Sequence, residues 1–332
     1  MGTRFATLLS VMLLSLTLNA QKTRIGQWWN DLSVYQFNKM PPRTNVIPYS
    51  DENGVENLEY MNSSYYMNLN GYWKFFFIES PEKEIGQFYS KDFNTNDWDS
   101  IAVPGNWELN GFGTPVYVNA RNEFTSNPPY APMDYNPVGR YRHDFNVPKD
   151  WDGRKIYLNF GAVKSAFYLW INGKFVGYSE DSKTPAEFDV TPYVKAGSEN
   201  FLAVEAYRFS DGSYLEAQDF WRMSGITRDV VLYSKPKLNI SDYFVKAGLD
   251  ENYENGTLDV SVDINFDKMP SKCTVEIILT GLDKSGERIN KVISREVSKK
   301  DLKKFKKSKI YTLNLKQQVI KDVLPWSAET PN

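Results

Sequence analysis

The chain has 332 residues, with 39 lysines and arginines, 41 aspartates and glutamates and a formal net charge of −2. A charge this close to neutral argues against a general nucleic-acid-binding surface, which needs an excess of basic residues. Apolar residues make up 41% of the chain, which excludes wholesale disorder. The length suggests about two domains.

The chain contains one cysteine, Cys273, and one histidine, His143. A single cysteine excludes an intrachain disulfide and a cysteine-rich zinc site, and a single histidine excludes any metal site with two histidine ligands. Hydrolytic chemistry in this chain would therefore rely on carboxylates or on His143.

The first 20 residues have the pattern of a signal peptide. Arg4 lies near the start, an apolar run covers residues 5–18, and the small residue Ala20 precedes the expected cleavage point. The alternative is a membrane anchor, but the run is shorter than the ~20 residues needed to span a bilayer. We expect an exported protein, periplasmic or secreted, with no membrane span.

From about residue 70 onward, apolar and polar residues alternate in short runs. The clearest run covers residues 257–266, and another covers residues 140–147. A period of two is typical of strands with one face in the core and one in water. Asn172-Gly173 lies between two apolar runs and predicts a hairpin with a type I′ turn. The sequence therefore predicts an all-β protein, most simply two sandwiches.

The expected organisation has four parts. After the signal peptide (1–20), residues 21–60 show little periodicity and are expected to form an extended arm. Residues 61–236 form an aromatic-rich first domain, and residues 237–332 form a lysine-rich second domain. Within the second domain, the charge run at residues 298–309 is interpreted as a solvated loop between strands rather than a basic patch for an anionic partner.

The densest cluster of polar and aromatic residues covers residues 207–230, with four acids and three arginines that can pair internally. Ser210-Asp211-Gly212 predicts a turn, where the Asp211 carboxylate can accept hydrogen bonds from sugar hydroxyls or bind a cation; the alternative is a carboxylate that only caps the turn. A second segment, residues 113–132, is rich in proline and contains Asn119, whose amide can both donate and accept.

These segments, in this order, resemble the N-terminal part of glycoside hydrolase family 2, specifically the long bacterial β-galactosidases. The resemblance covers nearly all of the chain after residue 20, and the longest block is residues 210–230. The other matching segments are residues 38–43, 69–75, 103–107, 115–130, 136–141 and 325–332.

The resemblance implies a jelly-roll-like, galactose-binding sandwich followed by an immunoglobulin-like sandwich that is incomplete at its C-terminus. In whole enzymes of this family, a barrel follows and holds the acid/base and nucleophile glutamates of a retaining mechanism. By motif position, Asn119 resembles the residue that contacts the galactosyl group, and Asp211 resembles the residue that binds galactosyl hydroxyls and sodium. Magnesium bound by the barrel and a homo-oligomeric assembly are implied for the complete enzyme.

The catalytic glutamate motifs of the family do not occur in these 332 residues. We therefore expect no catalytic residue here and no hydrolysis by this chain alone, as for a fragment or a truncated gene. Its partners would be β-galactoside sugars and a catalytic barrel, and neither nucleic acid nor a membrane. Two alternatives remain open: a free-standing carbohydrate-binding module, and a family 2 glycosidase acting on a glucuronide or a mannoside.

Other residues have simpler explanations. Glu216 and Asp219 are rejected as a catalytic pair because Arg222 and Arg228 lie close in sequence, whereas an acid pair meant for catalysis needs one member with a raised pKa. His143 is expected to be half-buried in a sheet, and Cys273 to pack as a small apolar group. Most aromatic residues should fill the core, so Trp107, Tyr117 and Trp221 are the three selected as candidates for a surface that binds sugar rings.

Overall fold

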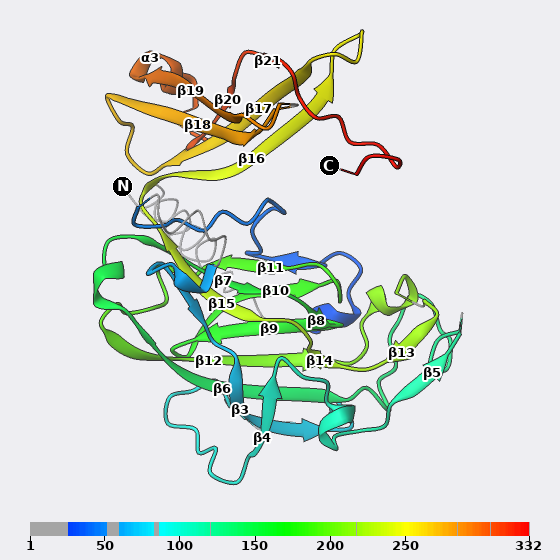
Figure 1. The fold of residues 1–332 in the computed structure, drawn as a ribbon. Helices are drawn as coiled ribbons and strands as arrows, with labels where there is room; N and C mark the ends of the chain where they lie inside the picture. Colours follow the sequence, from blue (N-terminus) through cyan, green and yellow to red (C-terminus); the bar gives the residue numbers. More distant parts are fainter. Residues whose placement is uncertain are drawn as a thin grey trace, which may run out of the picture.

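The computed structural model describes residues 26–51, 60–82, 86–119, 121–216, 218–283, 285–305 and 307–331. The predicted signal peptide lies outside these residues. The described chain forms two antiparallel β-sandwiches, one above the other in Figure 1, and the turn at Pro236-Lys237 connects them. This confirms the all-β prediction. Among the described residues, no helix has the length and hydropathy needed to cross a membrane.

The first sandwich consists of a seven-stranded and a four-stranded sheet. The larger sheet has the order β1-β10-β9-β12-β6-β3-β4 and the smaller the order β11-β7-β15-β2. The bounds of the larger sheet are β1 (Gln36–Phe37), β3 (Gly71–Ile78), β4 (Asp99–Val103), β6 (Val138–Val147), β9 (Ala166–Ile171), β10 (Lys174–Glu180) and β12 (Ser198–Tyr207). Those of the smaller sheet are β2 (Tyr66–Asn68), β7 (Lys155–Phe160), β11 (Ala186–Asp189) and β15 (Val230–Lys235).

Two short strand pairs and several single helical turns lie outside these sheets. The pairs are β5 (Val116–Val118) with β13 (Phe220–Arg222), and β8 (Val163–Lys164) with β14 (Gly225–Ile226). The 3-10 turns of the first sandwich are η1 (Trp28–Asn30), η2 (Tyr60–Asn62), η3 (Glu108–Asn110), η4 (Lys149–Trp151) and η5 (Asp211–Tyr214).

The seven-stranded sheet is buried on both faces. In β9, Phe167, Leu169 and Ile171 enter the core between the two sheets, whereas Ala166, Tyr168 and Trp170 enter a second cluster on the opposite face. Successive side chains of a strand point to opposite faces, and a hydrophobic cluster covers each face here, so all six residues are buried. This explains why the segment is uniformly apolar rather than alternating.

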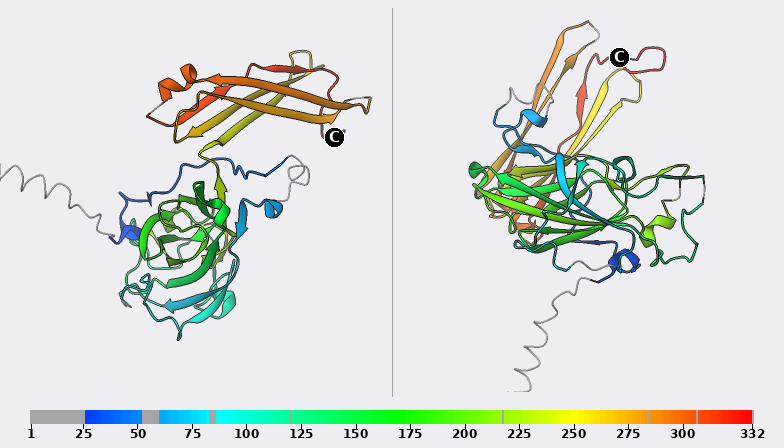
Figure 2. Two further views of the ribbon diagram at one scale, coloured as in Figure 1. Left: turned by 90° about the vertical axis from the view of Figure 1, so that its left-hand side faces the viewer. Right: turned by 90° about the horizontal axis from the view of Figure 1, so that it is seen from below.

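The described part of the predicted arm covers this second face. Trp28 and Trp29 are buried in the second cluster, and the Trp28 backbone N–H donates to the Tyr168 hydroxyl at 2.7 Å. Strand β1 then pairs with β10 and adds a strand to the sheet edge. Farther along, the arm runs beneath the second sandwich (Figure 2, left), where the Thr44 N–H donates to the Asp242 carboxylate at 3.0 Å.

The predicted hairpin at Asn172-Gly173 is confirmed. Both residues have positive φ angles, 51° and 78°, as a type I′ turn requires, and they connect β9 to β10. The Asn172 amide nitrogen also donates to the Tyr193 carbonyl oxygen and to Asn200 Oδ1. The turn is therefore fixed by tertiary contacts as well as by its backbone preference.

The second sandwich is smaller. One sheet contains β16 (Leu238–Leu249), β17 (Gly256–Phe266), β20 (Ile310–Asn314) and β21 (Gln318–Ile320), and the other is the β18 (Lys272–Leu282) and β19 (Arg288–Ser298) hairpin. Strand β17 alternates between buried and half-buried residues along its whole length, as its sequence predicts. Its buried residues, with Val275, Val297, Leu302 and Leu313, make up the core of this sandwich.

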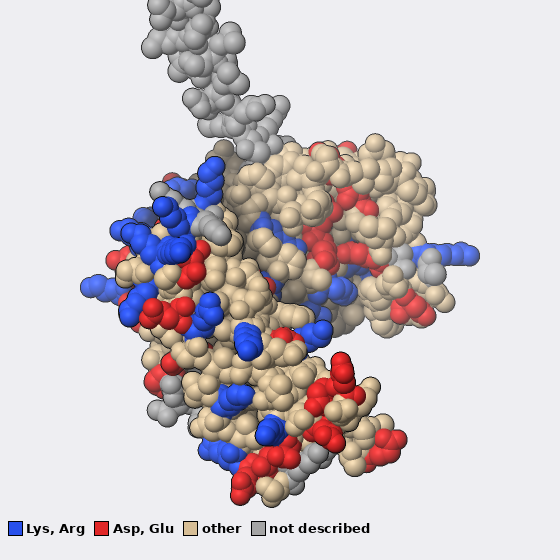
Figure 3. Space-filling model, turned by 90° about the horizontal axis from the view of Figure 1, so that it is seen from above, with Lys and Arg blue, Asp and Glu red and all other residues tan. Residues whose placement is uncertain are grey.

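The lysine-rich run connects strands, as expected, but part of it is helical rather than a plain loop. Residues α3 (Lys299–Leu302) and η6 (Lys303–Phe305) form two short turns. The Ser298 and Asp301 side chains cap the first turn reciprocally, and Leu302 is fully buried in the core. The face seen from above in Figure 3 carries acidic and basic side chains intermixed, so its lysines lie among carboxylates.

Gly139, a buried residue of β6, offers a direct test of the packing in the first core. A Cβ atom at this position would lie 2.4 Å from Cζ2 of Trp107 and 2.7 Å from Cε2 of Phe75. We expect Gly139→Ala to lower the free energy of unfolding by about 1–3 kcal/mol, because two fully buried rings must move. Urea denaturation measures the change.

Gly281→Ala in β18 is the matched control. No atom lies within 4 Å of its added Cβ. We expect its free energy of unfolding to stay within about 0.5 kcal/mol of the parent. Equal stabilities of the two variants would contradict the close approach of Gly139 to the rings.

Candidate functional site

Asp211 lies on a single helical turn that follows β12. The turn η5 begins after Ser210, whose side chain and that of Ser213 cap it reciprocally. The Ser210 hydroxyl also lies 2.7 Å from the Ser165 hydroxyl, which attaches the turn to the end of β8. The predicted turn is therefore present. It leaves Asp211 buried, with an exposed fraction of 8%.

The Asp211 carboxyl shares its buried environment with Glu180, the last residue of β10. The two carboxyls interact with each other, and the Glu180 carboxyl is the hydrogen-bond partner of Asp211; neither has a cationic partner among the described residues. The buried Tyr178 hydroxyl donates to Glu180 Oε1 at 2.5 Å. Burial raises the pKa of both carboxyls, and the pKa of Glu180 rises to about 8.

Sequence reasoning did not find Glu180. It is the last residue of β10 and belongs to no motif; the only signal in the sequence is a single acid at the end of a strand whose last five residues are buried. A cavity of about 620 Å³ lies beside it, between the arm and η5. Its lining includes Arg43, Glu180, Gly212, Leu215 and Glu216.

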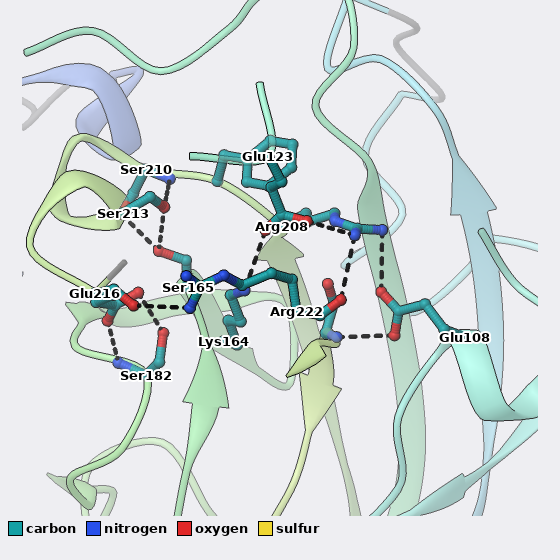
Figure 4. A network of polar contacts seen from close by, with 12 residues as sticks. Glu108, Glu123, Lys164, Ser165, Ser182, Arg208, Ser210, Ser213, Glu216 and Arg222 are labelled. Atoms are coloured by element: carbon teal, nitrogen blue, oxygen red, sulfur yellow. Dashed lines mark hydrogen bonds and ion pairs between the residues drawn. The ribbon is translucent and has the colours of Figure 1, made fainter. Parts of the chain in front are cut away.

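Asn119 follows the last residue of β5 and is exposed. Its carbonyl oxygen accepts a hydrogen bond from Nη2 of Arg222 at 3.1 Å. Nη1 of the same arginine donates to the Glu216 carbonyl oxygen at 3.2 Å. One buried guanidinium thus connects the two segments that the sequence singled out, as Figure 4 shows for Arg222 and its neighbours.

Arg208 makes a second connection between the same segments. Its guanidinium pairs with Glu123 at 2.7 Å and with Glu108 at 3.1 Å, and all three side chains are at most 5% exposed. Lys164 pairs with Glu123 at 3.4 Å (Figure 4). Acids and arginines of residues 207–230 were predicted to pair with one another. This prediction is wrong for Arg208, whose partners are the Glu108 and Glu123 carboxylates outside that segment.

Glu216 and Asp219 each have a hydrogen-bond donor of their own. The Ser182 backbone N–H and hydroxyl donate to the Glu216 carboxylate at 2.8 and 2.7 Å. The Tyr117 hydroxyl donates to Asp219. The arginines expected to hold these acids act elsewhere: Arg222 on backbone carbonyls, and Arg228 on the Lys183 carbonyl at 2.9 Å.

His143 and Cys273 lie where the sequence predicted. His143 is half-buried in β6 and stacks on Trp73 with ring centroids 4.7 Å apart, and burial lowers its pKa. Cys273 is partly buried in β18 against the core of the second sandwich, and burial raises the pKa of its thiol.

The three aromatic candidates separate into two groups. Trp107 is not a surface residue: it is fully buried, and its indole N–H donates to the Tyr141 hydroxyl. The rings that surround it in the core were not evident from the sequence around residue 107. Tyr117 and Trp221 are exposed, with fractions of 54% and 55%.

Asp211 fits a hard cation only in part. Its carboxyl group can supply one oxygen ligand of the kind that such ions prefer. However, the described residues form no group of three or more His, Cys, Asp or Glu residues that could hold a metal. Any further ligands of a sodium ion would be backbone oxygens, water, the sugar or residues outside this set.

Residues 66–236 match the model of the sugar binding domain of glycosyl hydrolases family 2. The chain belongs to that family.

The chain is also similar to curated β-galactosidases. It is 42% identical over 312 residues to the β-galactosidase of Priestia megaterium, covering 92% of this chain and 29% of the relative. It is 46% identical over 198 residues to that of Vibrio cholerae serotype O1, covering 60% of this chain and 19% of the relative. The chain thus spans less than a third of the length of these relatives.

Solved structures show the same fold at low identity. A β-glucuronidase of Bacteroides uniformis matches 80% of this chain and 29% of its own, with a TM-score of 0.55 and 22% identity. A β-glucuronidase of Bifidobacterium dentium matches 81% and 44%, with a TM-score of 0.54 and 19% identity.

Removal of the Arg208 guanidinium should destabilise the chain strongly. In Arg208→Met, the Glu108 and Glu123 carboxylates stay buried without their main cation. We expect a loss of about 3–5 kcal/mol in the free energy of unfolding, measured by urea denaturation. Lys272→Met is the control, because its pair with Glu296 is 69% and 60% exposed, and it should lose at most about 1 kcal/mol. Similar losses in both would contradict the buried network.

The raised pKa of Glu180 predicts a pH dependence of stability. Between the usual glutamate value of 4.5 and about 8, the folded chain keeps a proton that the unfolded chain has released. Stability from this group is complete below pH 4.5 and is lost as the pH rises through the folded pKa. Glu180→Gln, which cannot ionise, should therefore gain stability relative to the parent as the pH rises.

Denaturation series across this pH range measure the difference between Glu180→Gln and the parent. Glu296→Gln serves as the control, since that carboxylate is 60% exposed. It should run parallel to the parent at every pH. A parallel course for Glu180→Gln as well would show that Glu180 is already ionised in the folded chain at neutral pH.

Proposed function

We propose that these residues are the N-terminal region of an exported β-galactosidase that hydrolyses terminal, non-reducing β-D-galactose residues. The observation that carries the proposal is the 42% identity to a curated β-galactosidase along 92% of the chain. The glucuronidase structures are at most 22% identical, so their likeness bears on the fold rather than on the sugar.

In this proposal the chain builds one wall of the galactose pocket and performs no bond cleavage alone. Asp211 offers a carboxyl group on η5, beside Glu180, and Asn119 is held at its carbonyl by Arg222. These two side chains would bind galactosyl hydroxyls, and Asp211 would contribute an oxygen to sodium. The two glutamates, the magnesium ligands and the barrel would lie on polypeptide outside these residues.

The acids near the site support this division. A retaining glycosidase needs one ionised carboxylate and one protonated acid about 5–5.5 Å apart, on either side of the scissile bond. Glu216 and Asp219 are instead held separately, by Ser182 and Tyr117. A homo-oligomer of the complete enzyme also belongs to the proposal.

Hydrolysis of nitrophenyl glycosides tests the function. A longer protein that continues these residues to the length of the relatives should hydrolyse o-nitrophenyl β-galactoside, whereas the 332-residue chain should not. In the longer protein, Asp211→Asn should lower kcat/KM at least tenfold, since it removes a charged hydrogen-bond acceptor worth about 1.5–3 kcal/mol. Asp99→Asn on exposed β4 should leave kcat/KM unchanged.

Three outcomes would contradict the proposal. Robust turnover by the 332-residue chain would mean that the catalytic groups lie within it. A longer protein that hydrolyses only the β-glucuronide or the β-mannoside would replace galactose with that sugar. Binding of galactose by the chain, with no hydrolysis by any longer protein, would favour a free-standing carbohydrate-binding module.

Export is proposed from the pattern of residues 1–20. Expression in a bacterium with a functional secretion pathway should give a mature chain that begins at Gln21. Intact-mass measurement of the material outside the cytoplasm checks the cleavage point. A chain retained in the cytoplasm with Met1 intact would contradict export.

A further inference from the structure

The β5–β13 ribbon carries an exposed pair of aromatic rings. Tyr117 and Trp221 are direct partners in the strand register, and their ring centroids lie 5.6 Å apart. Both side chains are more than half exposed. The ribbon extends from one end of the first sandwich, at the right in Figure 1. An exposed aromatic pair of this kind marks a surface of contact rather than part of a core.

Two polar side chains continue the same face. Asn119 and Asp219 each lie one residue beyond these strands and two positions from Tyr117 and Trp221, so continued alternation places both on this face. The hydrogen bond from the Tyr117 hydroxyl places the Asp219 carboxylate beside that ring. Asn119 and Asp219 are both exposed.

The opposite face of the ribbon is anchored to the sandwich. Arg222 is buried, and its guanidinium carbon lies 4.6 Å from the centre of the Phe220 ring. The same guanidinium bonds to the Asn119 and Glu216 carbonyl oxygens. The inner face therefore fixes the position of the outer face, which reduces the entropy lost when a ligand binds there.

The outer face has the chemistry of a pyranose site. The rings offer flat apolar surface to the C–H face of a sugar, and the amide and carboxylate offer a donor and acceptors to its hydroxyls. Its four side chains, Tyr117, Asn119, Asp219 and Trp221, include no cation. The Asp219 charge would repel an acidic sugar, so the ligand that fits is neutral.

We propose that the outer face of the β5–β13 ribbon binds a pyranose ring of a neutral saccharide. Tyr117 and Trp221 form the stacking surface, and Asn119 and Asp219 bind the hydroxyls. The choice of a galactoside as ligand rests on the proposed function. The inference adds Tyr117, Asp219 and Trp221 to the sugar-binding residues.

The test is an NMR titration of the 332-residue chain with lactose, followed through the indole N–H signals of ¹⁵N-labelled tryptophan. The Trp221 signal should shift and saturate. Trp326, which is 68% exposed on the second sandwich, should not shift. By calorimetry, Trp221→Ala should weaken binding about fivefold or more, since it removes half of the stacking surface. Trp326→Ala should bind like the parent.

Two further variants test the inference even if Trp221→Ala does not fold. Tyr117→Phe keeps the ring and removes only the bond to Asp219, so it should retain stacking and lose part of the hydroxyl recognition. Asp219→Asn should admit a β-glucuronide that the parent rejects. Both variants can be checked for native structure by their urea midpoints before titration.

Three results would overturn the inference: an unshifted Trp221 signal with every neutral sugar, equal binding by parent and Trp221→Ala, or equal affinity of the parent for a β-glucuronide and lactose. The first two leave hydrolysis of galactosides by a longer protein unaffected. A Trp221 shift with a neutral β-mannoside but not with lactose would support the ribbon site and contradict the galactoside assignment.

Discussion

The Arg208 guanidinium, buried between two carboxylates, is the interaction on which the site depends. Residues 108–123 and residues 208–222 are far apart in sequence and come from irregular segments. Without this cation, Glu108 would be a buried charge with no cationic partner among the described residues, and Glu123 would keep only its pair with Lys164. Their pairing with Arg208, together with the contacts of Arg222 to backbone carbonyls, holds these segments in one arrangement. The η5 turn and the β5–β13 ribbon take their positions from it.

In this structure, the strands of the first sandwich and the segments that would contact a sugar are different parts of the chain. The chain has the same fold as the two β-glucuronidase structures, although its sequence is only 22% and 19% identical to theirs. Because one fold can carry different activities, the strand order alone does not determine which sugar such a protein binds. Asn119, Asp211 and Asp219, which we propose bind sugar hydroxyls, lie on such segments.

Local patterns in the sequence were sufficient for much of the fold. The alternation in residues 257–266 predicted β17, and Asn172-Gly173 predicted the turn between β9 and β10, because both depend on properties of adjacent residues. The turn at Ser210-Asp211-Gly212 was also predictable, since its caps are local. The family followed from the order of several such segments.

Features that depend on distant neighbours were not predictable in this way. Trp107 resembles a surface aromatic in its own segment and is buried because Phe75, Tyr141 and Gly139 surround it. Leu302 is buried in a core formed by other strands, and the part of the lysine-rich run that contains it is helical. Glu180 becomes a partner of Asp211 only when β10 meets the turn after β12. In each case the deciding contact joins segments far apart in the chain.

The position of Trp28 and Trp29 has a consequence for the order in which the molecule assembles. These rings leave the ribosome among the earliest parts of the described chain, yet the hydroxyl that receives the Trp28 N–H belongs to a residue 140 positions later. Until β9 and β10 exist, the two indoles have no surface to cover and β1 has no neighbour to pair with. Residues 28–37 therefore cannot adopt their final position before β9 and β10 have formed. Until then their aromatic side chains are exposed and can bind a chaperone.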